Sequence, residues 1–165
     1  MPSYKELLDA GVHFGHLKKK WNPKMSPYIF TERKGIHLID LNRTSEGLER
    51  AGQAARQMAR AGKKILFVAT KKQARELVAN AARSVNMPFV TDRWLGGMLT
   101  NFSTIRRSVR KMQNIERMLG DGSLTSVTKK ERLTLTREHT KLDKVLGGIA
   151  NLNRIPSAMF LVDIN

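Results

Sequence analysis

The sequence predicts an α/β fold: a doubly wound parallel sheet into which a long pair of helices is inserted. Two observations carry this prediction. Short apolar runs bounded by loop residues alternate with helical segments, which is the order expected of a doubly wound sheet. A stretch of the chain between the last two of these runs has no strand signal at all. The predicted strands are residues 35–40, 65–69, 88–90 and 158–162.

The two strongest strand candidates are Ile65–Ala69 and Ala158–Val162, which are continuously apolar. Runs without polar alternation are typical of a parallel sheet covered by helices on both faces. Between the strands, residues 44–61 and 72–85 are predicted to be helical. For the first helix, Thr44 or Ser45 is the expected N-cap, and Gly62 stands just beyond its end.

The segment 101–146 predicts an antiparallel helical hairpin. Its apolar residues recur at alternating spacings of four and three, as in one seam of a coiled coil, and Gly120–Ser123 is a strong turn signal. The hairpin is expected to end at Gly147–Gly148. The seam residues are Ile105, Val109, Met112, Ile115 and Leu119 on the first helix, and Leu135, His139, Leu142, Leu146 and Ile149 on the second.

These elements predict a body of residues 1–100 and 147–165 that carries the hairpin of residues 101–146. Residues 162–165 are predicted to be the end of a strand and its following loop, where a doubly wound sheet normally continues. We therefore expect the sheet to be incomplete at its C-terminal end and the sequence to be part of a longer one.

Charge is the outlying property of the composition. Thirty Lys and Arg residues against fourteen Asp and Glu residues give a formal net charge of +16 in a chain of 165 residues. So large an excess is self-repulsive unless a polyanion neutralises it, which favours a nucleic-acid partner. The chain has no cysteine, so disulfides, thiolate catalysis and cysteine-bound zinc are excluded.

The sequence shows neither a signal peptide at its N-terminus nor a run of about eighteen apolar residues. We therefore expect a cytoplasmic protein.

Basic and aromatic residues are most concentrated near the N-terminus. Four lysines there, which can neutralise phosphates, are interleaved with flat side chains that can stack on unpaired bases. For Trp21, Tyr28 and Phe30, burial in the core is the favoured alternative, because buried aromatic residues are the commoner case. The RNA-contact candidates in this segment are His16, Lys18, Lys19, Lys20, Trp21 and Lys24.

His13 and His16 are spaced so that both rings could approach one metal ion, with Asp9 or Glu32 as a third ligand. Two histidines alone do not make a metal site. Packing or RNA contact is the favoured interpretation, and the sequence predicts no metal and no cofactor.

A second candidate site is the loop 92–101, between a predicted strand and the hairpin. Its Gly96–Gly97 pair permits close backbone approach, and Thr100 or Asn101 is expected to cap the next helix, leaving amide groups that suit a phosphate. Arg93, Trp94 and Asn101 would complete an RNA contact. The alternative is a tight packing junction where the hairpin leaves the sheet, and both can hold together.

Residues 69–73 stand where an α/β fold would place a nucleotide loop, but they lack both glycine-rich phosphate-binding patterns. No nucleophile–base pair, paired carboxylates or metal–water group is visible either. The sequence therefore predicts no enzyme.

Several motifs occur together: residues 7–16 (LLDAGVHFGH), 21–25 (WNPKM), 93–101 (RWLGGMLTN), 146–149 (LGGI) and 156–163 (PSAMFLVD). Over its whole length the chain resembles the bacterial-type ribosomal protein S2 family of the small ribosomal subunit. The resemblance implies a Rossmann-like, or flavodoxin-like, domain carrying a coiled-coil hairpin. It also implies a non-catalytic structural role at the junction of head and body of the subunit, with ribosomal RNA, neighbouring ribosomal proteins and ribosomal protein S1 as partners. No homo-oligomer is expected.

The hypothesis from the sequence is thus RNA binding by the N-terminal lysines, the 93–101 loop and the hairpin, mostly through phosphates. On the hairpin the candidates are Arg106, Arg107, Arg110 and Lys111. Two alternatives remain open. A nucleotide-dependent enzyme would be stabilised by a mononucleotide, whereas a free-standing nucleic-acid regulator would not sediment with small subunits.

Overall fold

The computed structural model describes residues 2–121 and 128–163, and the chain divides into two compact units. The first unit is Met1–Gln57 and the second is Met58–Asn165. The long helix α2 (Leu41–Arg60) crosses the boundary between them. Each unit is built on its own three-stranded sheet.

The first unit contains an antiparallel sheet of order β1-β3-β2. A turn at Lys34 and Gly35, whose φ angles are 52° and 75°, joins β2 to β3. Two central residues with positive φ are the geometry of a tight hairpin that matches the strand twist. Helix α1 and two 3-10 segments complete the unit. The elements are α1 (Tyr4–Asp9), β1 (Phe14–Leu17), η1 (Lys18–Lys20), η2 (Pro23–Tyr28), β2 (Ile29–Arg33) and β3 (Ile36–Ile39).

The strand predicted at residues 35–40 is present as β3, but its expected place in the parallel sheet is wrong. It pairs antiparallel with both β1 and β2 in a separate sheet. Strands β1 and β2 were not predicted, because they are largely exposed and carry no buried apolar run.

Helix α2 begins at Leu41, three residues before Thr44, the first of the two predicted caps. The carboxylate of Asp40 accepts a hydrogen bond of 2.9 Å from the amide of Asn42, and its carbonyl oxygen accepts one of 3.2 Å from the amide of Thr44. Asp40 therefore caps the helix, a role in which aspartate is as effective as serine. Gly62 follows the helix with a φ of +68°, as predicted for a helix end.

The second unit contains the parallel sheet that the sequence predicted. Its order is β5-β4-β6, with Phe67 of the central strand paired with Phe89 on one side and Phe160 on the other. Helix α3, between β4 and β5, packs against both. The mixed α/β architecture with parallel strands is thereby confirmed. The elements are β4 (Ile65–Val68), α3 (Lys72–Ser84), β5 (Phe89–Val90) and β6 (Ala158–Leu161).

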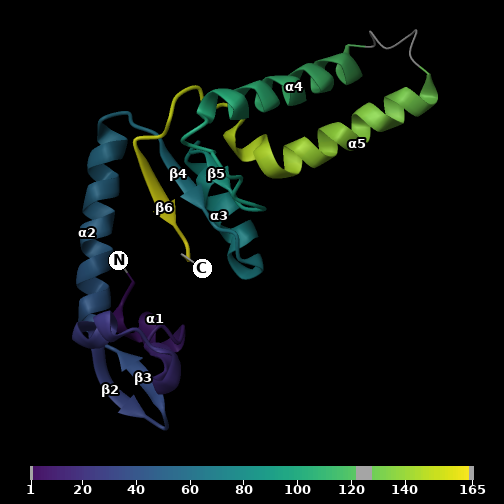
Figure 1. Cartoon of the computed structure of the whole chain (residues 1–165). Helices are drawn as coiled ribbons and strands as arrows, with labels where there is room; N and C mark the ends of the chain where they lie inside the picture. The colour runs from purple at the N-terminus through teal and green to yellow at the C-terminus, as the bar shows by residue number, and fades with distance from the viewer. Residues whose placement is uncertain (1, 122–127, 164–165) are drawn as a thin grey trace. The chain divides into compact units, whose positions relative to one another are not determined.

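Two long helices lie between β5 and β6 in the chain, and they run side by side in opposite directions (Figure 1). They are α4 (Phe102–Gly120) and α5 (Lys129–Leu146). The predicted turn at residues 120–123 lies partly outside the described residues. The predicted seam faces inward: Ile105, Val109, Met112, Ile115, Leu146 and Ile149 are buried, and Leu119, Leu135, His139 and Leu142 are partly buried.

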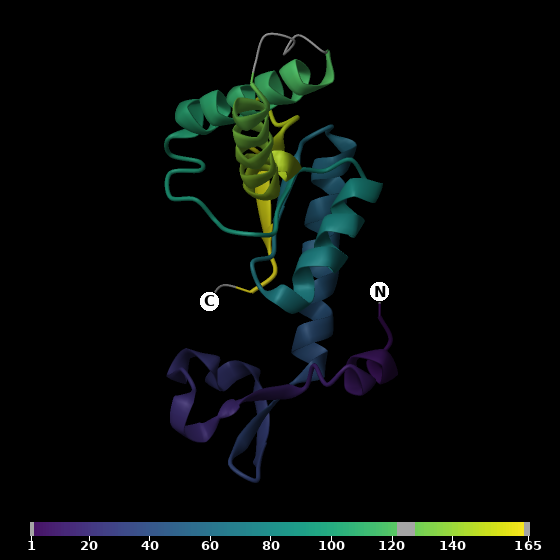
Figure 2. The same ribbon diagram turned by 90° about the vertical axis from the view of Figure 1, so that its right-hand side faces the viewer.

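One hydrophobic core joins the helix pair to the sheet. It takes residues from β4 and β5, from the first half of α4 and from the end of α5. The 3-10 turn η4 (Gly147–Ile149) follows α5 and lies against β5. Burial of so many aliphatic side chains in one cluster holds the base of the helix pair to the sheet. Figure 2 shows the yellow-green end of α5 and the turn after it beside the strands of the second unit. The cluster is Leu66, Val68, Val90, Met98, Ile105, Val109, Met112, Leu146, Ile149 and Leu152.

Candidate nucleic-acid interface

The N-terminal lysines lie together on short 3-10 segments that follow β1. All four side chains are exposed, as is His16 on β1. Lys18 is paired within the unit, its Nζ lying 2.7 Å from Oε2 of Glu32. Among the described residues, Lys19, Lys20 and Lys24 have no ion-pair partner, so their charges are free to neutralise phosphates.

The three aromatic residues of this segment have different environments. Trp21 is partly buried and meets the buried ring of His37 edge-on, with 4.8 Å between ring centroids and 85° between planes. The packing interpretation therefore describes Trp21 well. It is wrong for Tyr28 and Phe30, whose side chains are 49% and 76% exposed. Phe30 lies on a strand with no buried residue.

The histidines do not assemble a metal site within the described residues. No group of three His, Cys, Asp or Glu side chains there is placed to hold an ion. Glu32, one of the two carboxylates considered as a third ligand, is engaged by Lys18. The ring of His13 packs on Phe14 with 4.2 Å between centroids, which is a packing role.

In the 93–101 loop, the packing role and the exposed polar groups fall on different residues. Trp94 packs against the hydrophobic core, whereas Arg93 and Asn101 are exposed. Gly97 has a φ of +76°, and its carbonyl oxygen accepts a hydrogen bond of 2.7 Å from the amide of Asn101. Asn101 is the N-cap residue of α4, and its side-chain oxygen accepts from the hydroxyl of Thr104 at 2.9 Å rather than from a backbone amide.

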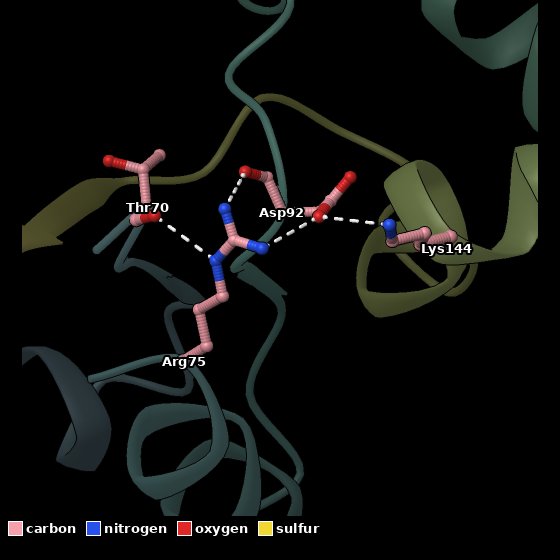
Figure 3. Close-up of polar contacts among 4 residues, drawn as sticks. All are labelled: Thr70, Arg75, Asp92 and Lys144. Atoms are coloured by element: carbon pink, nitrogen blue, oxygen red, sulfur yellow. Dashed lines mark hydrogen bonds and ion pairs between the residues drawn. The ribbon is translucent and has the colours of Figure 1, made fainter. Parts of the chain in front are cut away.

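A polar cluster that the sequence analysis missed lies at the carboxyl ends of β4 and β5 (Figure 3). The guanidinium of Arg75 donates to the carbonyl oxygen of Thr70 at 3.1 Å, and to both the carboxylate and the carbonyl oxygen of Asp92 at 3.0 Å. Lys144 of α5 lies 3.6 Å from the same carboxylate. The cluster ties both strand ends to α5. The only sign of this cluster in the sequence was that the basic Arg75 follows β4 and the acidic Asp92 follows β5, the next strand along the chain.

Ion pairs also cross the end of the sheet where an α/β enzyme binds its nucleotide. In such folds the ligand lies at the carboxyl ends of strands, where the connections diverge. Here Nζ of Lys71, which follows β4, lies 3.5 Å from a carboxylate oxygen of Asp163, which follows β6. Arg75 is bound to Asp92 beside it. Two cations at this position, Lys71 and Arg75, are therefore already paired, which weakens the nucleotide-enzyme alternative.

The four basic candidates on α4 divide into two pairs. Arg106 is turned inward, donating to the carbonyl oxygen of Ala150 at 3.1 Å and to Oδ1 of Asn153 at 2.8 Å. Lys111 forms an ion pair with Glu138 of α5. Arg107 and Arg110 are exposed and, among the described residues, have no ion-pair partner. They line a shallow groove of about 470 Å³ whose apolar walls include Ile115, Met118 and Leu135.

The structure thus defines a mixed α/β protein with a strongly cationic surface. None of its described helices is long and apolar enough to cross a membrane. The family model for ribosomal protein S2 matches residues 7–165, so the chain belongs to the ribosomal protein S2 family.

Bacterial relatives described as small ribosomal subunit protein uS2 align with 98% of this chain. The relative from Cytophaga hutchinsonii is 60% identical over 161 residues. Those from Bacteroides thetaiotaomicron and Azobacteroides pseudotrichonymphae are 56% and 57% identical over 162 residues. The chain spans 63%, 58% and 62% of the length of these three relatives, respectively.

Proposed function

We propose that the chain is a structural, non-catalytic constituent of the small subunit of the cytoplasmic ribosome. It binds ribosomal RNA at the junction of head and body. Membership of the ribosomal protein S2 family carries this proposal. The formal net charge of +16 and the exposed cations without internal partners are consistent with it.

The RNA-binding surface we propose has two parts, one in each unit. In both, the strongest contacts come from cations that no carboxylate of the described chain neutralises: Lys19, Lys20 and Lys24 in the first unit, Arg107 and Arg110 in the second. On RNA binding, Lys18 would leave the carboxylate of Glu32 and Lys111 that of Glu138, and each would pair with a phosphate instead. The remaining members of the surface are His16, Trp21, Arg93, Trp94, Asn101 and Arg106.

We further propose a Rossmann-like, or flavodoxin-like, body of residues 1–100 and 147–165 with an inserted coiled-coil hairpin of residues 101–146. The parallel sheet and the contacts between α4 and α5 support this division. The base of the hairpin shares the core of the sheet through Ile105 and Leu146. A shared core would hold the hairpin, which carries Arg107 and Arg110, at a defined angle to the sheet, so that it could make an extended contact with RNA.

Binding in this arrangement rests on phosphate position and RNA shape. Each neutralised phosphate releases counterions, so affinity falls steeply as salt rises. We expect the chain to be present in one copy per subunit rather than as a homo-oligomer. Its protein partners would be neighbouring ribosomal proteins, ribosomal protein S1 among them.

The proposal is tested with purified chain and small subunits stripped of this protein, over a salt series with unrelated structured RNA as competitor. Saturable one-to-one binding that survives the competitor is expected. The triple variant Lys18→Ala, Lys19→Ala, Lys20→Ala should bind more weakly. Binding that any RNA abolishes would overturn the ribosomal assignment, and an unimpaired triple variant would exclude the N-terminal part of the surface.

A further inference from the structure

A second basic site lies in the second unit, outside the surface proposed above. It is a pocket of about 480 Å³ beside β5, bordered by the end of α3, the end of α5 and the turn η4. A cavity of this size falls within the ~300–1,000 Å³ of small-molecule sites. It differs from the carboxyl-end cluster of Arg75 and Asp92, neither of which lines it.

The pocket carries an excess of positive charge. Lys64, Arg83 and Lys144 line it, and Asp143 is the one carboxylate among its lining residues. All three cations are exposed. Lys144 is paired with Asp92, which does not line the pocket, and like the other two it keeps donors beyond its internal contacts. Lys64 donates from Nζ to the carbonyl oxygen of Asn86 at 2.8 Å, and a second proton on this ammonium can meet an anion. An anionic ligand is therefore favoured over a neutral or cationic one.

Apolar and amide groups form the rest of the lining. Met87, Pro88 and Leu152 supply apolar surface, while Asn86 and Asn151 supply groups that both donate and accept hydrogen bonds. The guanidinium of Arg83 lies 4.9 Å from the ring centroid of Phe89, which keeps its charge at the pocket. A bare phosphate would use only the cations. A base attached to it would use the apolar and amide groups as well.

We propose that this pocket receives one unpaired nucleotide of an RNA strand. Its phosphate would lie against Lys64, Arg83 and Lys144, and its base would lie against the wall of Met87 and Leu152 with its polar edge toward the asparagines. Bases extruded from a strand are commonly held in this way, by apolar contact and edge hydrogen bonds. The inference rests on the proposed RNA binding. That binding otherwise depends on phosphate position and RNA shape, and the pocket would add recognition of a single-stranded nucleotide.

The test uses ¹³C-methyl methionine NMR of the whole chain. The signal of Met87 is identified by its loss in Met87→Leu, and the ligand is a short single-stranded oligoribonucleotide. A saturable shift of the Met87 signal is expected. Arg83→Gln should weaken binding about tenfold, as for loss of a charged hydrogen-bond donor. The matched control is Lys72→Gln, which removes the same charge from the opposite end of α3 and should change affinity less than about twofold.

Two further ligands test the source of the nucleotide. Adenosine monophosphate and inorganic phosphate should bind much more weakly than the oligonucleotide, because they lack the flanking phosphates. Equal binding by the mononucleotide would overturn the RNA occupant in favour of a free nucleotide. Equal binding by phosphate would reduce the site to an anion site.

Failure of this inference can be told apart from failure of the proposed function. If the Met87 signal does not respond while the chain still binds stripped small subunits, the pocket assignment alone is wrong. If the chain binds no small subunit and no RNA, the proposed function is wrong and the pocket assignment falls with it. Equal losses of oligonucleotide affinity in Arg83→Gln and Lys72→Gln would show only a general effect of charge on binding.

Discussion

The guanidinium of Arg106 on α4 donates to the carbonyl oxygen of Ala150 at 3.1 Å, joining two residues that are 44 positions apart. The same group also reaches Oδ1 of Asn153 at 2.8 Å. Its neighbour Arg107 points to the surface without an ion-pair partner among the described residues. Two consecutive arginines therefore have different environments: Arg106 is partly buried and hydrogen-bonded within the unit, whereas Arg107 is exposed.

Replacing Arg106 by glutamine should lower the free energy of unfolding by about 1–3 kcal/mol, because the charged donor to Ala150 is lost. Arg107→Gln is the matched control on the same helix and should leave stability within about 0.5 kcal/mol. Chemical denaturation followed by circular dichroism measures both. Equal stabilities for the two variants would contradict the internal role of Arg106.

The double variant Arg107→Gln, Arg110→Gln should bind ribosomal RNA more weakly without loss of stability. Each arginine that neutralises a phosphate contributes about one to the slope of log affinity against log salt. The slope should therefore become shallower by about two in the double variant, as measured by filter binding between low and moderate salt. A weaker affinity with an unchanged slope would mean that these arginines do not contact phosphates.

Gly148 permits a close approach between η4 and β5. A β-carbon at this position would lie 2.7 Å from Cδ2 of Phe89 and in collision with the carbonyl oxygen of the same residue. Gly148→Ala should destabilise the second unit by at least ~2 kcal/mol, since the backbone of β5 must shift. Gly96→Ala is the control, because no atom lies within 4 Å of its β-carbon position. Thermal unfolding of the two variants gives the comparison.

The ion pairs that Asp92 forms with Arg75 and Lys144 should stabilise the second unit. Asp92→Asn keeps the shape of the side chain but removes the charge that meets Arg75 and Lys144. The variant should lose about 1–3 kcal/mol of stability, as for a charge-assisted hydrogen bond. Lys71→Gln, which breaks only the more exposed pair with Asp163, should cost less than about 1 kcal/mol. The reverse order of the two losses, measured by urea denaturation, would contradict this account.

The start of α5 should respond to acid. The Thr128 side chain, and then its backbone amide, hydrogen-bond to the Glu131 carboxylate and hold its pKa below the ordinary value. A lowered pKa means that the cap stabilises the helix above the ordinary glutamate pKa and is lost as pH falls through the pKa of the folded state. Amide exchange in the first turn of α5 should therefore accelerate in acid.

Glu131→Gln provides the control for this pH effect. The uncharged amide still offers an oxygen to the Thr128 amide but does not titrate, so the acid dependence of exchange in that turn should disappear. An unchanged dependence in the variant would assign the effect to another group.

Local pattern alone predicted the parallel strands of the second unit, α3 and the inward seam of α4 and α5. These features follow from burial periodicity within one segment, such as the spacing of Ile105, Val109 and Met112, and they need no knowledge of distant residues. The motif resemblance similarly identified the family, which the family model confirms.

Tertiary structure decided what depends on residues far apart in the chain. It placed the strand at 36–39 in an antiparallel sheet, because pairing partners are not encoded in one strand's own pattern. It also separated Arg106 from Arg107 and brought Arg75 to Asp92. A basic side chain is the same residue in sequence whether a carbonyl, a carboxylate or solvent surrounds it. Its role is therefore set only when the fold determines which of these lies within hydrogen-bonding distance.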